Sequence, residues 1–278
     1  MDIAQIGGLG GVEQAIKRAA SATGVDFDFL MRTARRESGF DSGAHASTSS
    51  AAGLFQFVEQ TWMSALKQHG AAHGYARYAD LISQGADGKF YVPQGAEARK
   101  VVMDLRYDPH AAAVMAGELT SDHAAYLRGR VGREPTGGEL YAAHFLGPQG
   151  SARLIEAYNS NPNVTAASLL PDAAASNHGV FYHSGRALTV AEVYANLSRT
   201  GGDVAVQVAA ANDPGESAFT AYAGAAHLER MREEEMLVNF ILTDRDPGSG
   251  GGSSSPISSM FSSEMLSLLS EARDHRRP

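Results

Sequence analysis

A single glutamate on the apolar face of a predicted helix constrains this chain more than any other feature. Phe27, Leu30, Ala34 and Glu37 follow one another at intervals of three or four residues, which places them on one face of an α-helix. Because three of the four are apolar, this face is expected to pack against the core. The pattern predicts a mainly α fold in which Glu37 is withdrawn from water.

The ends of this helix and the acidity of Glu37 follow from its neighbours. Asp26 is a favoured N-cap residue, and Gly39 offers a C-terminal stop. Burial and the negative end of the helix dipole both disfavour a carboxylate, so the pKa of Glu37 should be raised. A carboxyl group that stays protonated near neutral pH suits general-acid catalysis. Taken alone, the spacing also fits a boundary residue whose head group reaches solvent.

Composition excludes several classes of function. The chain has 278 residues, enough for one large domain or one domain with a smaller appendage. Its net charge of −8 argues against a nucleic-acid partner and against adsorption to anionic membranes. Cysteine and the HExxH motif are both absent, so we predict no metal and no cofactor. We find no signal-peptide pattern in residues 1–11 and no stretch of transmembrane length.

Helix signals recur along the chain. Two capping boxes, Thr136 with Glu139 and Thr189 with Glu192, are expected to start helices. A turn at Asp87-Gly88 predicts a small loop or hairpin insertion over residues 85–93. Helical spacing predicts further helices over residues 12–20, 61–68, 109–127, 148–158 and 165–175.

The two ends of the chain differ in composition from its middle. We predict a flexible lead over residues 1–11, a folded domain over 12–200 and a helical extension over 201–247. Residues 248–255 are Gly and Ser-rich and resemble a linker. The tail, residues 256–278, contains a short amphipathic helix. This helix either packs back on the domain or docks, through residues 256–274, in the groove of a protein partner; the linker favours docking.

Two motifs near Glu37 carry a family resemblance. The first is Glu37-Ser38-Gly39-Phe40, an E-S-x-F pattern, and the second spans residues 47–56. Together they resemble the soluble lytic transglycosylase (SLT) family, which is related to goose-type lysozymes and shows S-x-x-G-A-x-G-L-M-Q in its second motif. Ser50 and Phe55 depart from that pattern. The positions that match it are Ser47, Ala51, Gly53, Leu54 and Gln56.

A third family motif, A-Y-N-A-G, is matched weakly by residues 143–147. His144 and Phe145 stand in place of its Tyr and Asn, which leaves open the residue that pairs with Glu37. The resemblance extends over roughly residues 10–200 and implies a lysozyme-like transglycosylase domain. Some relatives serve flagella or secretion machines that cross the cell envelope, which implies a periplasmic or envelope location with an export route left open.

The resemblance implies cleavage of the β-1,4 bond between N-acetylmuramic acid and N-acetylglucosamine in peptidoglycan glycan strands. Glu37 would donate a proton to the leaving oxygen. It would then accept one from the C6 hydroxyl, forming the 1,6-anhydro product. Ordinary glycosidases need a second carboxylate. In the Glu37 motif the other carboxylate is Asp41, whose position is typical of a turn.

The resemblance also suggests the residues that line the site. Phe55 and Phe145 would keep the acid dry or stack on sugars, while Gly53 would let the backbone approach the substrate. Three of the candidate residues have a structural alternative: Phe55 as a core residue, Gln56 as a turn cap, and His144 as a core histidine. The predicted substrate-binding residues are Ser47, Phe55, Gln56, His144, Phe145 and Tyr182, with Tyr182 in place of the missing family Tyr.

Three other functions fit the same motifs. A lysozyme-type hydrolase would use water instead of the C6 hydroxyl. A non-catalytic wall-binding scaffold of an envelope machine would keep the fold but not the chemistry. A chitin-directed glycosidase would act on a related polymer.

Overall fold

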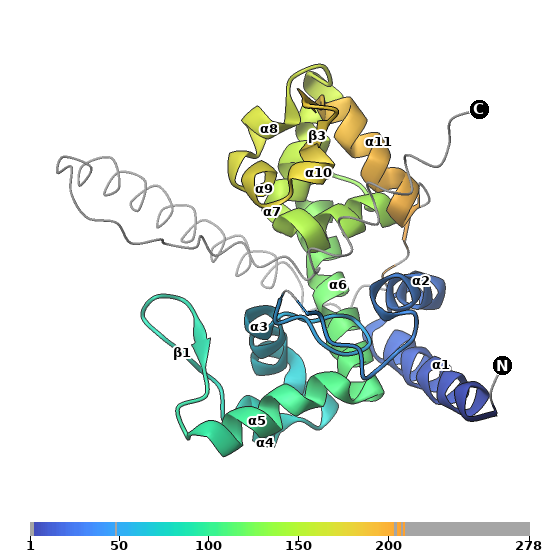
Figure 1. Cartoon of the computed structure of the whole chain (residues 1–278), viewed down its shortest axis with the longest axis vertical. Coiled ribbons are helices and arrows are strands. Elements are labelled where there is room, and N and C mark those ends of the chain that lie inside the picture. Colours follow the sequence, from blue (N-terminus) through green and yellow to red (C-terminus); the bar gives the residue numbers. More distant parts are fainter. Residues whose placement is uncertain (1–2, 48, 203–204, 207, 209–278) are drawn as a thin grey trace. The chain divides into compact units, whose positions relative to one another are not determined.

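The computed structural model describes residues 3–47, 49–202, 205–206 and 208, and these residues are mainly α-helical (Figure 1). The predicted linker over 248–255, the tail over 256–278 and nearly all of the extension over 201–247 lie outside the described residues. Over the described part, no helix combines the length and the apolar character that a membrane crossing requires.

The chain begins with helix α1, Ile3–Thr23, which packs along α6, Pro109–Val131 (Figure 1). Val12, Ile16 and Ala19, which lie on one face of this helix, are buried. The helix also includes residues 3–11, where we expected a flexible lead. A glycine costs about 1 kcal/mol in a helix but does not forbid it, and a helix that has nucleated extends more easily than it starts.

Helix α2, Phe27–Ser38, carries Glu37 near its C-terminal end. The Asp26 carboxylate accepts a hydrogen bond of 2.7 Å from the backbone N–H of Phe29. Gly39 has a φ of 61°, and its N–H bonds to the carbonyl of Arg35. Both predicted helix ends are therefore confirmed.

The loop that joins α2 to α3, Glu59–His69, is buried over residues 51–57. Gly53 in this loop has a φ of +77°, and a Cβ there would lie 1.9 Å from the carbonyl oxygen of Arg106. We expected this glycine to let the backbone approach substrate, but the structure shows that it lets the loop approach η2, Leu105–Tyr107. The Arg106 guanidinium adds hydrogen bonds to the carbonyls of Ser50 (2.6 Å) and Phe57 (3.0 Å). The loop is thus fixed by a segment about fifty residues away.

The predicted hairpin insertion is present (Figure 1). Strands β1, Ser83–Gln84, and β2, Phe90–Tyr91, pair antiparallel after η1, Gly70–His73, and α4, Ala76–Ala79. The Gln60 side chain on α3 accepts from the Phe90 N–H at 2.9 Å and donates to the Phe90 carbonyl at 3.0 Å. The insertion continues into α5, Ala96–Asp104.

Two histidines spaced as H-x-x-x-H tie α3 and η1 to α6. The Nε2 of His69 lies 2.8 Å from Asp122, and the Nε2 of His73 lies 2.5 Å from Glu118. Burial lowers the pKa of His69, but the hydrogen bond to Asp122 and the charges of Asp122 and Glu118 outweigh it, so the pKa is raised. The cluster is an ion-paired contact between helices.

Helix α7, Gly137–Ser160, packs between α6 and α11, Val190–Gly201. Gly147 interrupts α7 with a φ of 73°, directly before Pro148, so the two helices predicted here form one kinked element. Both predicted capping boxes are present, at Thr136 and at Thr189. The elements between α7 and α11 are α8, Ala166–Leu169; α9, Pro171–Ser176; α10, His178–Phe181; β3, Tyr182–His183; and β4, Arg186–Ala187.

Candidate active site

Glu37 lies on the buried face of α2, as its spacing predicts. Leu30 and Ala34 on the same face are fully buried, Phe27 is half-buried, and Glu37 is 9% exposed. Both carboxyl oxygens of Glu37 are inaccessible to solvent, and neither has a hydrogen-bond partner within the described part of the chain. The residue is therefore not a boundary glutamate whose head group reaches water.

Burial makes Glu37 a weak acid. Desolvation raises the pKa of its carboxyl group well above the usual value, and the nearby Arg36 guanidinium opposes part of that rise. The balance follows from physical chemistry, because an apolar environment penalises the charged form while a neighbouring cation stabilises it. A raised pKa favours the protonated carboxyl group, which is the form that a general acid requires.

Unpartnered polar atoms concentrate around this residue. Among the described residues, the buried side-chain atoms without a partner are both oxygens of Glu37, Nε of Arg36 and Nδ1 of His123. Buried polar groups are almost always hydrogen-bonded in folded proteins, so an exception needs an explanation such as a reactive role. His123 and Arg36 reach the same helix, α7, through contacts with His144 and Tyr141. The unsatisfied atoms mark the junction of α2, α6 and α7 as a candidate site.

Tyr141 forms the part of α7 that is close to the acid. The Arg36 guanidinium lies 4.0 Å from the centre of its ring. Burial raises the pKa of Tyr141, Arg36 opposes the rise, and the charge of Glu37 adds to it. Tyr141 lies outside the motifs from which the site residues were predicted. Its position three residues before His144, on the same helix face, was the available signal.

His144 is packed as a neutral side chain. Its ring stacks on Phe29 at 6.4 Å and meets His123 edge-on at 5.0 Å. Its Nε2 is 3.3 Å from the hydroxyl of Thr120, which itself donates to the Ala116 carbonyl. Burial lowers the pKa of His144 well below its usual value, and His123 and Arg36 lower it further. These contacts favour the core-histidine interpretation over a proton-transfer role.

The second motif is joined to the first by a hydrogen bond. The Ser38 hydroxyl, next to Glu37, donates to the Leu54 carbonyl at 2.8 Å. Gln56 holds the same loop from inside, because its side-chain amide donates to the carbonyls of Gly53 (2.9 Å) and Ala44 (3.3 Å). Its φ of 48° places it in the left-handed region. The structure therefore supports the turn-capping role of Gln56.

The remaining predicted residues occupy different environments. Phe55 and Phe145 are buried in the core, which favours packing over direct contact with sugar. Ser47 is exposed at the start of the second motif. Tyr182 stacks on His178 at 4.2 Å. Because the oxygens of Glu37 accept no hydrogen bond in the described part, Tyr182 does not supply the contact we expected from it.

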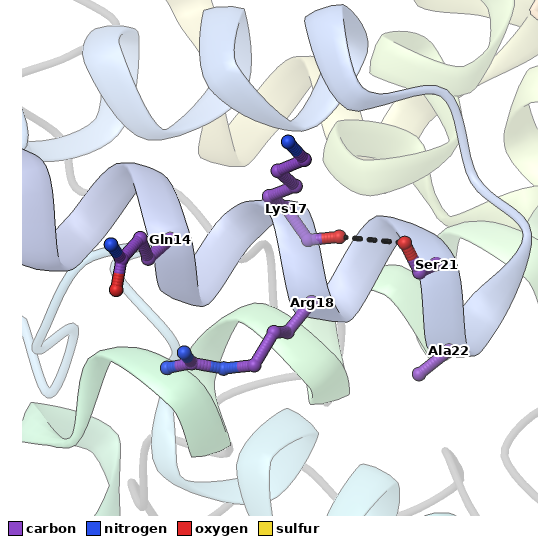
Figure 2. A pocket seen from close by; sticks show the side chains of 5 residues that line it. All are labelled: Gln14, Lys17, Arg18, Ser21 and Ala22. Carbon is purple, nitrogen blue, oxygen red and sulfur yellow. Dashed lines mark hydrogen bonds between the residues drawn. The ribbon is translucent and has the colours of Figure 1, made fainter.

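Two other features of the described residues were alternatives for the site, a metal-binding cluster and a surface pocket. No group of three or more His, Asp or Glu side chains in the described ranges is arranged to hold a metal ion. A shallow hollow of about 470 Å³ lies on α1, lined by Gln14, Lys17, Arg18, Ser21 and Ala22 (Figure 2). Lys17 and Arg18 extend to opposite sides of the helix in Figure 2. The lining comes from one helix and contains no carboxyl group, so we do not place the site there.

A comparison with protein families supports the region around Glu37. Residues 14–80 match the model of the Transglycosylase SLT domain, which confirms the resemblance inferred from the first two motifs. The match begins in α1 and includes Glu37 and residues 47–56. Residues 143–147 and Tyr182 lie outside it.

Proposed function

We propose that this chain, whose residues 14–80 belong to the SLT transglycosylase family, is a lytic transglycosylase. It cleaves the β-1,4 bond between N-acetylmuramic acid and N-acetylglucosamine in peptidoglycan, with Glu37 as the single acid and base. The observation that carries the proposal is the Glu37 carboxyl group, which is buried and has no partner within the described part of the chain.

The first step uses the proton that burial retains on Glu37. In this step, Glu37 donates its proton to the glycosidic oxygen as the bond to the muramic acid C1 breaks. The N-acetyl carbonyl of the same sugar stabilises the positive charge that develops at C1. Glu37, now a carboxylate, accepts the proton of the C6 hydroxyl, whose oxygen bonds to C1. The carboxyl group regains its proton, and the sugar ends as a 1,6-anhydro ring.

The carboxylates of the described part favour this single-acid scheme over a two-carboxylate hydrolase. Its buried carboxyl groups belong to Glu37 and Glu139. Glu139 is already bonded to Arg133, Tyr194 and the Thr136 backbone. Asp41, next to the motif, is exposed and accepts the Gly43 N–H in a turn.

The burial of Glu37 has a consequence for substrate binding. Both carboxyl oxygens are inaccessible in the structure. A glycan chain must therefore displace whatever covers them before a proton can be transferred. The bound sugars would then exclude water from Glu37 again and keep the acid in a low-dielectric environment.

Digestion of purified sacculi followed by mass spectrometry tests the reaction. A transglycosylase yields anhydro-muropeptides, which are two hydrogens and one oxygen lighter than the hydrated products. Hydrated reducing ends alone would support the lysozyme-type hydrolase instead. The Glu37→Gln variant is the matched control, because it keeps the shape of the side chain and removes its acidity. Wall binding without lysis by the wild type would support the scaffold, and preferred cleavage of chitin oligomers would support the chitin-directed enzyme.

We propose that the protein works in the periplasm or cell envelope, because peptidoglycan lies there. We propose glycan strands as its principal partner. The proposed docking of residues 256–274 on a flagellar or secretion partner concerns residues outside the described part and remains a prediction. Pull-down with full-length and 1–255 chains measures it directly.

A further inference from the structure

We infer that Arg36 is a positioning residue that holds a fixed positive charge beside Glu37 and stabilises the carboxylate formed when the proton leaves. This inference deepens the proposed function and rests on it for the reaction step. The position of the charge is inferred separately, from the contacts of the Arg36 guanidinium. It assigns a role to the residue directly before the glutamate of the first motif.

Arg36 is fixed at two points. Its guanidinium lies over the Tyr141 ring, 4.0 Å from the ring centre, and its Nη1 donates to the Thr200 carbonyl at 2.9 Å. Tyr141 belongs to α7 and Thr200 to the last turn of α11. A planar guanidinium suits both contacts, since it stacks on aromatic faces and donates along fixed directions. The charge is thus held by two helices other than its own.

The charge of Arg36 is not cancelled by a carboxylate of the described residues. Its Nε is buried without a partner in the described part of the chain, and its Nη1 donates to a neutral backbone carbonyl. Arg133 is the contrasting case, because it forms a salt bridge with Glu139. The charge of a partly buried cation acts over several ångströms, and the Arg36 guanidinium is near enough to Glu37 to oppose the rise in its pKa.

The other titratable groups around Glu37 are neutral side chains. Tyr141 and His144 approach from α7 and His123 from α6. Burial lowers the pKa of His123 to about 4, and it lowers that of His144 as well. Burial keeps Tyr141 protonated by raising its pKa. Arg36 is therefore the group whose charge stabilises the Glu37 carboxylate.

The sign of the effect on catalysis follows directly. Removing the positive charge disfavours the carboxylate, so the acid holds its proton to a higher pH and releases it less readily. We expect Arg36→Gln to move the alkaline limb of the pH–rate profile for sacculus lysis upward by about one unit or more. The rate on the acidic plateau should fall at the same time.

The control is Arg35→Gln, which removes the same formal charge from an exposed position on α2. Solvent screens that charge, so the limb should stay where it is in the wild type. Arg36→Lys keeps the charge without the planar group that stacks on Tyr141, and its shift should be smaller than that of Arg36→Gln. A slower Arg36→Gln enzyme with an unmoved limb would show a merely structural role and overturn the inference.

A second measurement does not depend on lytic activity. Carbon-13 NMR of the labelled Glu37 carboxyl group reports its titration in the wild type and in Arg36→Gln. An upward shift in the variant supports the inference even if the wild type proves inactive on peptidoglycan, which would count against the proposed function alone. If Arg36→Gln does not fold, Tyr141→Leu removes the face that holds the guanidinium. An unchanged Glu37 titration in that variant would overturn the inference.

Discussion

Two buried glutamates in this protein have opposite surroundings. Glu37 on α2 is 9% exposed and Glu139 on α7 is 1% exposed. The oxygens of Glu37 have no partner in the described part of the chain. Glu139 accepts hydrogen bonds from two nitrogens of Arg133 (2.8 and 2.5 Å), from the Tyr194 hydroxyl (2.7 Å) and from the Thr136 N–H (2.8 Å).

The difference in partners reverses the effect of burial on acidity. Burial raises the pKa of Glu37, and Arg36 only moderates the rise. Burial also acts to raise the pKa of Glu139, but the hydrogen bonds from Arg133, Thr136 and Tyr194 outweigh it and lower the pKa. The comparison teaches that the partners of a buried carboxyl group, more than its burial, separate a reactive acid from a structural anion.

The largest expected difference between the two is in catalysis. Glu37→Gln should reduce sacculus lysis by a factor of about 10²–10⁴, because the general acid is lost. Glu139→Gln should retain most of the activity of whatever fraction is folded. Turbidity assays at equal concentrations of folded protein measure both. Comparable losses in the two variants would contradict the distinction.

Loss of folding stability should be larger for substitution of Glu139 than for substitution of Glu37. Glu139→Ala leaves Arg133 and the Thr136 N–H without their anion, and we expect a loss of about 1.5–3 kcal/mol near neutral pH. Because the folded-state pKa of Glu139 is lowered, its contribution is present above the unfolded-state pKa of about 4.3 and is lost as pH falls through the folded-state value. Urea unfolding of wild type and variant at several pH values would reveal this. A loss of stability that did not shrink in acid would argue against an electrostatic role.

Glu37→Gln should stabilise the fold at neutral pH. The folded-state pKa of Glu37 is raised, so above pH about 4.3 the unfolded chain ionises this group more readily than the folded chain does. Wild-type stability therefore falls as pH rises from there to the folded-state pKa, by about 1.4 kcal/mol for each unit between the two values. Thermal unfolding from pH 4 to pH 8 measures the difference. A variant less stable than the wild type at pH 7 would show that the carboxyl group has stabilising partners.

The smallest effect is expected at Tyr194. Its hydroxyl donates to Glu139 at 2.7 Å, while its ring stacks on Tyr158 at 4.1 Å. Tyr194→Phe keeps the stacking and removes the hydrogen bond, so it should cost about 0.5–1.5 kcal/mol and leave lysis unchanged. A double-mutant cycle with Glu139→Gln isolates this bond. If the losses of stability in the two single variants simply add in the double variant, the hydrogen bond between Tyr194 and Glu139 contributes nothing.

The local parts of this comparison were predictable from sequence, and the distant parts were not. Asp26, Gly39 and the Thr136–Glu139 capping box act on backbone groups three or four residues away. The helix ends predicted from them are therefore confirmed. The spacing also predicted that Glu37 is buried. The partners of Glu139 include Tyr194, 55 positions away, and those of Arg36 include Thr200, 164 positions away. Such contacts depend on how α7 packs against α2 and α11, which no periodicity encodes.

The same limit explains the role of Gly53. We expected Gly53, a residue of the second motif, to let the backbone approach the substrate, but the segment that leaves no room for a Cβ at this position is η2. Its neighbour Phe55 packs in the core for the same reason, because the loop is held against distant backbone. Sequence identified this loop correctly and assigned its contacts to the wrong partner.

Titration of both buried glutamates in the wild-type protein tests the account most directly. Carbon-13 labelling of the glutamate side chains, with Glu37→Gln and Glu139→Gln to assign the signals, gives the two values in one experiment. We expect the Glu37 carboxyl group to titrate well above pH 4.5 and the Glu139 carboxyl group below it. A Glu37 signal that titrates at or below the value of an exposed glutamate would contradict the proposal that Glu37 is a protonated general acid.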